Sequence, residues 1–346
     1  MITNKIYFTL IIISVLISNL FSQTTATKTS NYRYKQTAKT ELIINNNLGN
    51  INVINSKNDS IIVEIRISSK STNEKKATKL LDKASINEAI KDNYITITTK
   101  LENVKESEDL HIDYVIKTPI NTRLFIANKH GNIYFGDFKG KININLNYGK
   151  FVAKNLIFTE STPLSNLNFK FCDVNIDNCN WAEINSSHTN LNITNSKSLI
   201  INSDYSIVKL EQNTILKLKS KNDIYKINSI SKISGTTENT STYAKNVTTS
   251  INIIGDKGYF KTGYISSYFD SINIDYINGD VNLLIDENTS YNIKAEVFDG
   301  ELNIDNTYKA DNIKGSNSRL VEGLIGTDTK TNKKVTAKVT NGNLEF

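Results

Sequence analysis

Apolar residues recur at a fixed step of 17 positions between residues 167 and 230 of this 346-residue chain. Three apolar columns run through four successive passes: Leu167, Ile184, Ile201 and Leu218; Val174, Leu191, Val208 and Tyr225; and Ile176, Ile193, Leu210 and Ile227. A further column, two positions after the first, contains Ser186, Ser203 and Ser220. A fixed period of about 20 residues is typical of a solenoid, in which each repeat stacks on its neighbours.

Each repeat contains two short runs in which apolar and polar residues alternate, such as Ile184–Ser186 and Leu191–Ile193. Such alternation, interrupted by Asn, Ser, Asp and Gly, predicts strands and turns. We therefore expect an all-β chain, a β-solenoid whose coils stack about 4.8 Å apart. Parallel crossovers favour a right-handed β-helix. The alternative is an antiparallel sandwich, because sandwich strands also recur about every 8–12 residues.

The first 22 residues have the pattern of a secretory signal peptide. Lys5 precedes an apolar run over residues 6–20, which is short for a membrane span of about 20 residues. A retained N-terminal anchor is the alternative. We expect residues 23–40 to be a flexible polar lead-in and residues 41–346 to form a single solenoid domain. The chain ends on a strand at Phe346, so we expect no C-terminal anchor and a periplasmic or secreted protein.

Two stretches interrupt the strand pattern. Over residues 71–93, apolar residues recur at roughly helical spacing, and Ser71 with Glu74 resembles a capping box. This predicts an amphipathic helix that covers the first coil, whose core and strand edges are otherwise exposed. Residues 235–250 are rich in Thr and Asn and predict a polar loop that leaves the stack.

Composition excludes a nucleic-acid surface. The net charge is +6, but the basic residues are nearly all lysines scattered among acids, whereas nucleic-acid surfaces cluster Lys and Arg with stacking aromatics. The two cysteines, Cys172 and Cys179, are seven positions apart and form either a disulfide or two buried thiols. Two cysteines lack the second pair that zinc needs, so we expect no metal and no cofactor.

Histidines and carboxylates are the first candidates for chemistry. His188 shares its column with Phe171 and Tyr205, which predicts a ring stacked on rings, while His111 and His130 fall on other coils. No Ser-His-Asp order is visible.

Asp177 and Glu211 share a column two coils apart, about 9.6 Å by the coil spacing. A glycoside hydrolase needs two carboxylates about 5–9.5 Å apart, so this pair lies at the limit.

Aromatic residues between positions 259 and 276 are the best candidates for a binding surface. Tyr259, Tyr264 and Tyr268 could stack on sugar rings from a flat sheet. Alternatively, Phe260 and Phe269 fill the core while the tyrosines cover it.

A short motif, a glycine followed by alternating apolar residues, recurs in the chain. It occurs in Gly131–Phe135, Asn278–Leu283, Phe298–Leu302 and Asn341–Leu344, and a similar glycine is found at Tyr148-Gly149. We expect glycine to supply a positive φ at these positions. The motifs closely resemble those of exported bacterial β-strand-repeat proteins known as putative adhesins, and the Asn/Lys-rich composition is similar to members from Bacteroidetes. The resemblance implies a β-solenoid in the cell envelope and carries no catalytic residues.

Together these features predict a non-enzymatic envelope protein with a binding or structural role, whose partner is a glycan or another envelope protein. A carbohydrate-active enzyme, either a polysaccharide lyase or a glycoside hydrolase on the same scaffold, is one alternative. A periplasmic scaffold or sensor partner of envelope proteins is the other.

Overall fold

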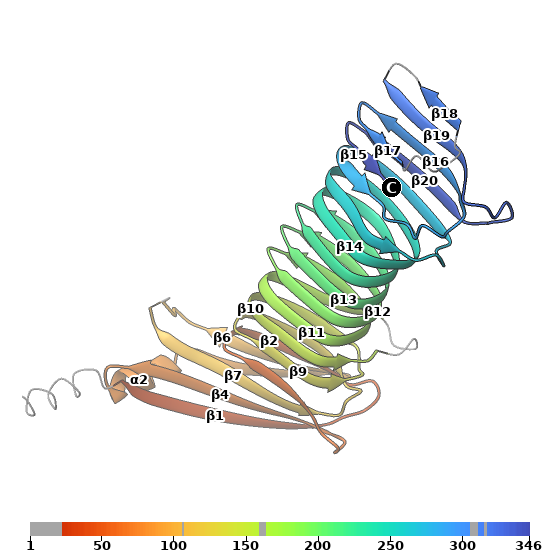
Figure 1. Cartoon of the computed structure of the whole chain (residues 1–346). Helices are drawn as coiled ribbons and strands as arrows, with labels where there is room; N and C mark the ends of the chain where they lie inside the picture. Colours follow the sequence, from red (N-terminus) through yellow and green to blue (C-terminus); the bar gives the residue numbers. More distant parts are fainter. Residues whose placement is uncertain (1–22, 106, 159–163, 305–310, 315–316) are drawn as a thin grey trace, which may run out of the picture.

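The computed structural model describes residues 23–105, 107–158, 164–304, 311–314 and 317–346. Its strands join into one hydrogen-bonded sheet of 21 strands, which confirms the prediction of an all-β chain. Figure 1 shows this sheet as a long stack, with β1, β4 and β7 at one end and β16, β18 and β19 at the other. The predicted signal peptide lies outside the described residues. No helix in the described ranges is long and apolar enough to cross a membrane.

At the N-terminal end, two branches of the sheet lead into the stack. One branch has the order β1-β4-β7-β3-β9 and the other β5-β6-β2-β8, and both pair with β10. The elements of this end are β1 (Thr24–Lys35), β2 (Glu41–Leu48), β3 (Ile51–Asn55), β4 (Ser60–Ser71), α2 (Glu74–Leu81), β5 (Ala84–Lys91), β6 (Tyr94–Leu101), β7 (Asp109–Thr118), β8 (Arg123–His130) and β9 (Ile133–Phe138).

The expected flexible lead-in is wrong, because β1 pairs antiparallel with β4 along its whole length. Its β-branched threonines suit a strand, and Tyr32 and Tyr34 pack on the core. The helix predicted over residues 71–93 is also too long, since α2 ends at Leu81 and β5 follows. The two residues between β5 and β6 include Asp92 with φ of 55°, which closes a hairpin that the helical spacing concealed.

The middle of the chain is a stack of parallel strands. It contains β10 (Ile142–Leu156), β11 (Ser165–Ser187), β12 (Asn190–Asp204), β13 (Ile207–Lys221), β14 (Ile224–Ile265) and β15 (Ser271–Asn282). Partner residues from β11 to β14 lie 17 positions apart, as in Ile184 opposite Ile201 and Ile201 opposite Leu218. The predicted step is therefore the register of the sheet. We call each pass of the chain a rung.

The loop predicted over residues 235–250 is wrong, because β14 runs through it. Threonine is a good strand residue, and here its hydroxyl satisfies backbone groups inside the fold. Thr240 is fully buried, and its Oγ1 donates to the carbonyl of Glu238 at 3.0 Å. The polar composition of this stretch therefore reflects hydroxyl groups that are buried inside the fold.

The C-terminal end departs from simple stacking. It contains β16 (Tyr291–Phe298), β17 (Leu302–Asn303), β18 (Asp311–Lys314), β19 (Ser318–Ile325), β20 (Lys334–Thr340) and β21 (Leu344–Glu345). Strand β20 comes late in the chain but pairs in parallel with both β15 and β16. Strand β19 then pairs antiparallel with β16, so the direction of pairing changes at both ends of the stack.

The core consists of the predicted columns. All twelve apolar residues of the three columns are at most 2% exposed, and Ser186, Ser203 and Ser220 are buried beside them. Phe260 and Phe269 are also buried, as the alternative reading of the aromatic segment requires.

One column of corner residues runs along most of the stack: Gly49, Gly131, Gly149, Cys172, Thr189, Ser206, Asp223, Thr240, Gly258, Gly279 and Gly342. At Gly149 the positive φ belongs to the preceding residue, Tyr148, which corrects the expected role of this glycine. A Cβ on Gly149 would lie 2.0 Å from the carbonyl oxygen of Gly131 on the next rung. Close approach of the rungs therefore demands glycine there.

Candidate functional site

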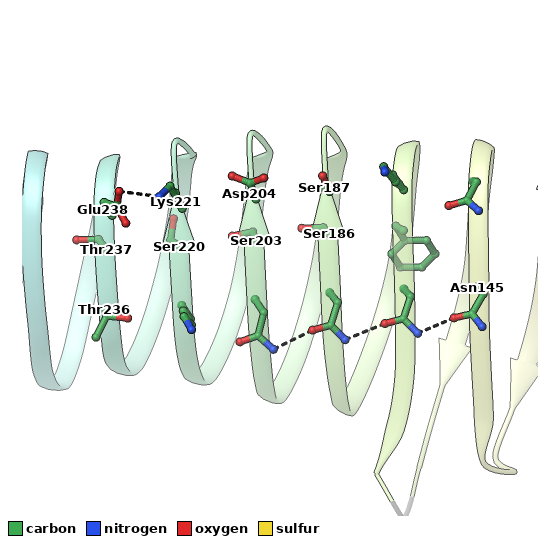
Figure 2. A pocket seen from close by; sticks show the side chains of 17 residues that line it. Asn145, Ser186, Ser187, Ser203, Asp204, Ser220, Lys221, Thr236, Thr237 and Glu238 are labelled. Carbon is green, nitrogen blue, oxygen red and sulfur yellow. Dashed lines mark hydrogen bonds and ion pairs between the residues drawn. The ribbon is translucent and has the colours of Figure 1, made fainter.

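A groove of about 1080 Å³ crosses six rungs on one face of the stack. One side is a row of outward residues: Asn145, Asn168, Asn185, Asn202, Lys219 and Thr236. The opposite rim carries Asn147, Lys170, Ser187, Asp204, Lys221 and Glu238. Between them lie the strands at Phe169, Ser186, Ser203, Ser220 and Thr237, whose side chains are on the core side because alternate residues of a strand face opposite ways. Figure 2 shows the two rows running across the rungs.

The asparagines on one side of the groove form a hydrogen-bonded ladder (Figure 2). Asn168 Nδ2 donates to Asn145 Oδ1 at 2.6 Å, Asn185 to Asn168 at 2.8 Å, and Asn202 to Asn185 at 2.9 Å. Each bond uses one amide hydrogen and one oxygen lone pair. The other contacts of the Asn185 and Asn202 amides are long, at 3.3 and 3.5 Å. The row therefore keeps acceptor lone pairs available on its four asparagines and weakly held N–H groups on Asn185 and Asn202.

The opposite rim carries charge. Lys221 Nζ lies 2.8 Å from Glu238 Oε1, and this hydrogen bond raises the pKa of the lysine. Asp204 lies one rung away from Lys221, and its Oδ1 is buried without a hydrogen-bond partner in the described structure. The groove thus offers amides, hydroxyls and lysines to a polar ligand, whereas Asp204 Oδ1 is out of its reach.

A buried polar network lies behind the groove. Asp223 accepts the hydroxyls of Ser203 and Ser220, both at 2.6 Å, and the backbone N–H groups of Ser206 and Lys221 at 2.7 and 3.1 Å. Burial raises the pKa of this carboxyl, and the hydroxyl hydrogen bonds oppose that effect. The network fixes the strands that form the centre of the groove.

Five aromatic rings stack along the corner next to the rim. They are His130, Tyr148, Phe171, His188 and Tyr205, and we call them the aromatic ridge. Successive centroids are 5.2, 5.0, 4.8 and 5.0 Å apart. The prediction that His188 stacks between Phe171 and Tyr205 is confirmed. His188 Nδ1 also lies 3.0 Å from the hydroxyl of Ser187 on the rim, so ridge and groove are adjacent.

The tyrosines predicted to bind a ligand do not line the groove. Tyr259, Tyr264 and Tyr268 are exposed, and Tyr268 is 84% exposed. Lys261 Nζ sits 5.5 Å from the Tyr259 ring centroid, and the Tyr264 hydroxyl donates to Asp286 at 2.7 Å. These tyrosines stay a prediction for a second surface.

The predicted carboxylate pair is also outside the groove. Asp177 and Glu211 are both exposed and lie in one column two rungs apart, as their spacing predicted. His111 and His130 do line a common hollow of about 880 Å³ near the N-terminal end, which their sequence positions did not predict. His111 pairs there with Asp109 at 3.0 Å. No group of metal-ligating side chains occurs in the part of the chain that the structure describes.

Both cysteines are free and buried, so no disulfide joins them. Cys172 occupies the corner column, and its Sγ donates to the carbonyls of Leu146 and Lys170 at 3.3 and 3.2 Å. Burial raises the pKa of Cys172, and raises that of Cys179 to about 12. Both side chains are therefore held as unreactive thiols.

We expect native protein to leave a thiol-specific disulfide reagent unreacted at pH 8, because the thiolate is the reactive form. Addition of urea should release two reactive thiols per chain. Absorbance of the released chromophore measures both states. Rapid labelling of the native protein, or fewer than two thiols after unfolding, would contradict the buried free thiols.

One sequence pattern predicts one side of the groove, although the more regular hydrophobic columns drew attention away from it. Asn168, Asn185 and Asn202 follow the first apolar column by one position and repeat at the same step of 17. A column of amides at that period predicts a ladder on the outer face of the sheet. Which outer column borders a groove depends on the opposite rim, which has no repeated residue type.

No protein-family model and no curated protein sequence matches the chain. Solved structures do. A putative adhesin from Bacteroides fragilis is 14% identical, with a TM-score of 0.32, over 92% of this chain and 96% of that one. A putative cell adhesion protein from Clostridium sporogenes is 11% identical, with a TM-score of 0.23, over 92% and 98%. A putative lipid binding protein from Parabacteroides distasonis is 10% identical, with a TM-score of 0.27, over 75% and 94%. The chain is thus similar to structures described as putative adhesins, the group that its glycine motifs resemble.

Proposed function

We propose that the protein is an exported, non-enzymatic binding protein of the bacterial cell envelope, built as a right-handed β-solenoid, and that its groove binds a linear glycan. The observation that carries the proposal is the row of asparagine amides, one per rung on four successive rungs of the groove. A linear glycan repeats its hydroxyl groups along one axis. A protein surface with a regular row of amides can bind such a ligand at every unit.

The dimensions of the groove favour an extended polymer. Six rungs at about 4.8 Å give a track of about 24 Å, and each rung presents polar side chains on both rows. A sugar unit in an extended chain occupies about one rung. Lysines at both sides of the track, Lys170 and Lys219, can donate further hydrogen bonds to hydroxyl oxygens.

The carboxylates of the groove support binding over hydrolysis. Glu238 is engaged in an ion pair with Lys221, whereas a glycosidase needs two carboxyl groups free to flank the scissile bond. Oδ1 of Asp204 is buried, so the second carboxyl group of the groove presents at most one oxygen to a bound glycan.

The test compares two asparagines of one rung. Purified residues 23–346 are titrated with a panel of bacterial and plant polysaccharides, and polymer length is measured in the same samples. We expect one or more polymers to bind without being shortened. Asn185→Leu, in the groove ladder, should weaken binding at least tenfold.

Asn192→Leu is the matched control, because Asn192 belongs to an exposed ladder on another column and donates to Asn175 at 3.0 Å. It should bind as the unaltered protein does. An equal loss of binding in both variants, or no loss in either, would contradict binding of the glycan in the groove. Shortening of a polymer would instead show that the protein is an enzyme, and Asp177 and Glu211 would then be the first candidate catalytic residues.

A further inference from the structure

The aromatic ridge occupies a backbone position that does not suit it. Tyr148, Phe171, His188 and Tyr205 all have φ between 49° and 55°, the left-handed region. That region costs most L-residues about 1–2 kcal/mol and is entered readily by glycine and asparagine. A bulky residue with positive φ is an outlier that calls for a reason other than backbone geometry.

The chain itself uses asparagine at the same corner on later rungs. Asn222 and Asn239 have φ of 55° and 48°, and they make their own ladder, with Asn239 Nδ2 donating to Asn222 Oδ1 at 2.8 Å. Asn278 and Asn341 repeat the arrangement nearer the C-terminus. The fold can therefore close this corner without aromatic rings. The four rings with positive φ lie on the four rungs that carry the amide ladder of the groove.

Stacking leaves the edges of the rings exposed. Tyr148 and Phe171 are nearly parallel, with an interplanar angle of 5°, so each covers a face of the other. Tyr148, Phe171 and Tyr205 are nevertheless 48%, 39% and 56% exposed. A sugar ring cannot stack on faces that are already covered. The exposed edges form an aromatic strip whose four successive steps are 5.2, 5.0, 4.8 and 5.0 Å, and small apolar groups can pack against its C–H edges.

We propose that the aromatic ridge, which adjoins the rim of the groove, extends the binding surface and selects glycans carrying acetamido groups. The inference rests on the proposed function and names its ligand class. An acetamido group has one N–H, one carbonyl and a methyl group. The amide of one such group can pair with the asparagine row in the same way as the asparagines pair with one another, and the methyl of another can pack against ring edges.

The two sides of the track fit the symmetry of such a chain. In a β-1,4-linked glycan, successive rings are turned over, so acetamido groups point alternately to the two sides. The asparagine row and the ridge are three residues apart in sequence, as Asn185 and His188 are, and the rim residue Ser187 lies between them. One set of acetamido groups then meets the amide ladder and the other meets the ridge.

The test uses two hexamers that differ only at one position of each sugar: β-1,4-linked N-acetylglucosamine and β-1,4-linked glucose. Calorimetric titration of the unaltered protein should show at least tenfold tighter binding of the acetylated hexamer. The double variant Phe171→Asn, Tyr205→Asn carries the residue that the chain uses at its other corners. It should fold and should bind the two hexamers with affinities within about threefold of each other.

Tyr243→Asn, at an exposed tyrosine outside the groove and ridge, is the control and should keep the preference. Should the double variant fail to fold, Tyr205→Asn alone, at the most exposed ring, makes the same test. A preference that survives in a folded variant would overturn the inference and leave the ridge a structural stack. Equal binding of both hexamers by the unaltered protein would also overturn it, while leaving the proposed function intact. Failure of either hexamer and of every polymer in the panel would overturn both.

Discussion

Replacing Asp223 by alanine should lower the free energy of unfolding by about 2–6 kcal/mol, although the residue touches no ligand. In the variant, the hydroxyls of Ser203 and Ser220 can still pair with Tyr225 and Thr240. The backbone N–H groups of Ser206 and Lys221 lose their acceptor. Each unsatisfied buried donor costs about 1–3 kcal/mol, and two of them give the expected range. Urea unfolding followed by tryptophan fluorescence measures the loss.

The pH dependence of this effect has a definite sign. Burial raises the pKa of Asp223 in the folded chain above that of the unfolded chain. The folded state therefore holds a proton that the unfolded state has released. The resulting stabilisation is complete below the unfolded-state pKa and is lost as the pH rises through the folded-state pKa.

Asp223→Asn removes the titration while keeping the size of the side chain. The unaltered protein should lose stability relative to this variant as the pH rises from acid to neutral. A difference in unfolding free energy that is constant over this range would contradict the raised pKa. An alanine variant as stable as the original would show that the network does not support the groove.

Gly235→Ala should destabilise the protein by at least about 2 kcal/mol. Gly235 pairs with Leu218, so sequence alone would extend the apolar column Leu167, Ile184, Ile201, Leu218 into this position. Its φ is 141°, and an added Cβ would lie 1.8 Å from the carbonyl oxygen of Leu218. That conformation is essentially reserved for glycine, so even one methyl group forces two rungs of the groove apart.

Gly136→Ala is the matched control. Gly136 lies in β9, and a Cβ there would meet nothing within 4 Å. Its replacement should leave stability unchanged or raise it by about 0.4–1 kcal/mol, because alanine restricts the unfolded chain. Parallel urea titrations of the two variants give the comparison. Equal effects at the two positions would contradict the role given to the backbone conformation of Gly235.

The period of the middle strands was predictable because one geometric rule governs it. Parallel rungs in register place identical steps of sequence in one column, and burial then demands apolar residues such as Ile184 and Ile201. The ends follow other rules. Strand β1 is antiparallel and half exposed, so its apolar residues are sparse and its threonines are typical of a loop as well as of an edge strand.

The polar composition of residues 235–250 led to the wrong prediction of a loop, because several of the hydroxyl groups there are buried. Thr237 and Thr240 occupy inward positions and are at most 5% exposed, although a run of threonines predicts solvent contact. The groove was missed for a related reason. Its asparagine row was visible as a column, but a row becomes one side of a groove only when the opposite rim, here Lys170 to Glu238, lies beside it. The aromatic ridge was predicted in part. The step of 17 placed His188 in a column with Phe171 and Tyr205, but it did not indicate the left-handed backbone of these residues.

The dependence of affinity on glycan length tests the central claim most directly. Residues 23–346 are titrated with a series of oligosaccharides, from one to ten units, of the polymer that binds. A ligand that lies along the groove gains contacts with each rung, so affinity should rise up to about five or six units and then level off, with the chains left intact. Equal affinity for one unit and for six, or shortening of the longer chains, would contradict a glycan-binding track across the rungs.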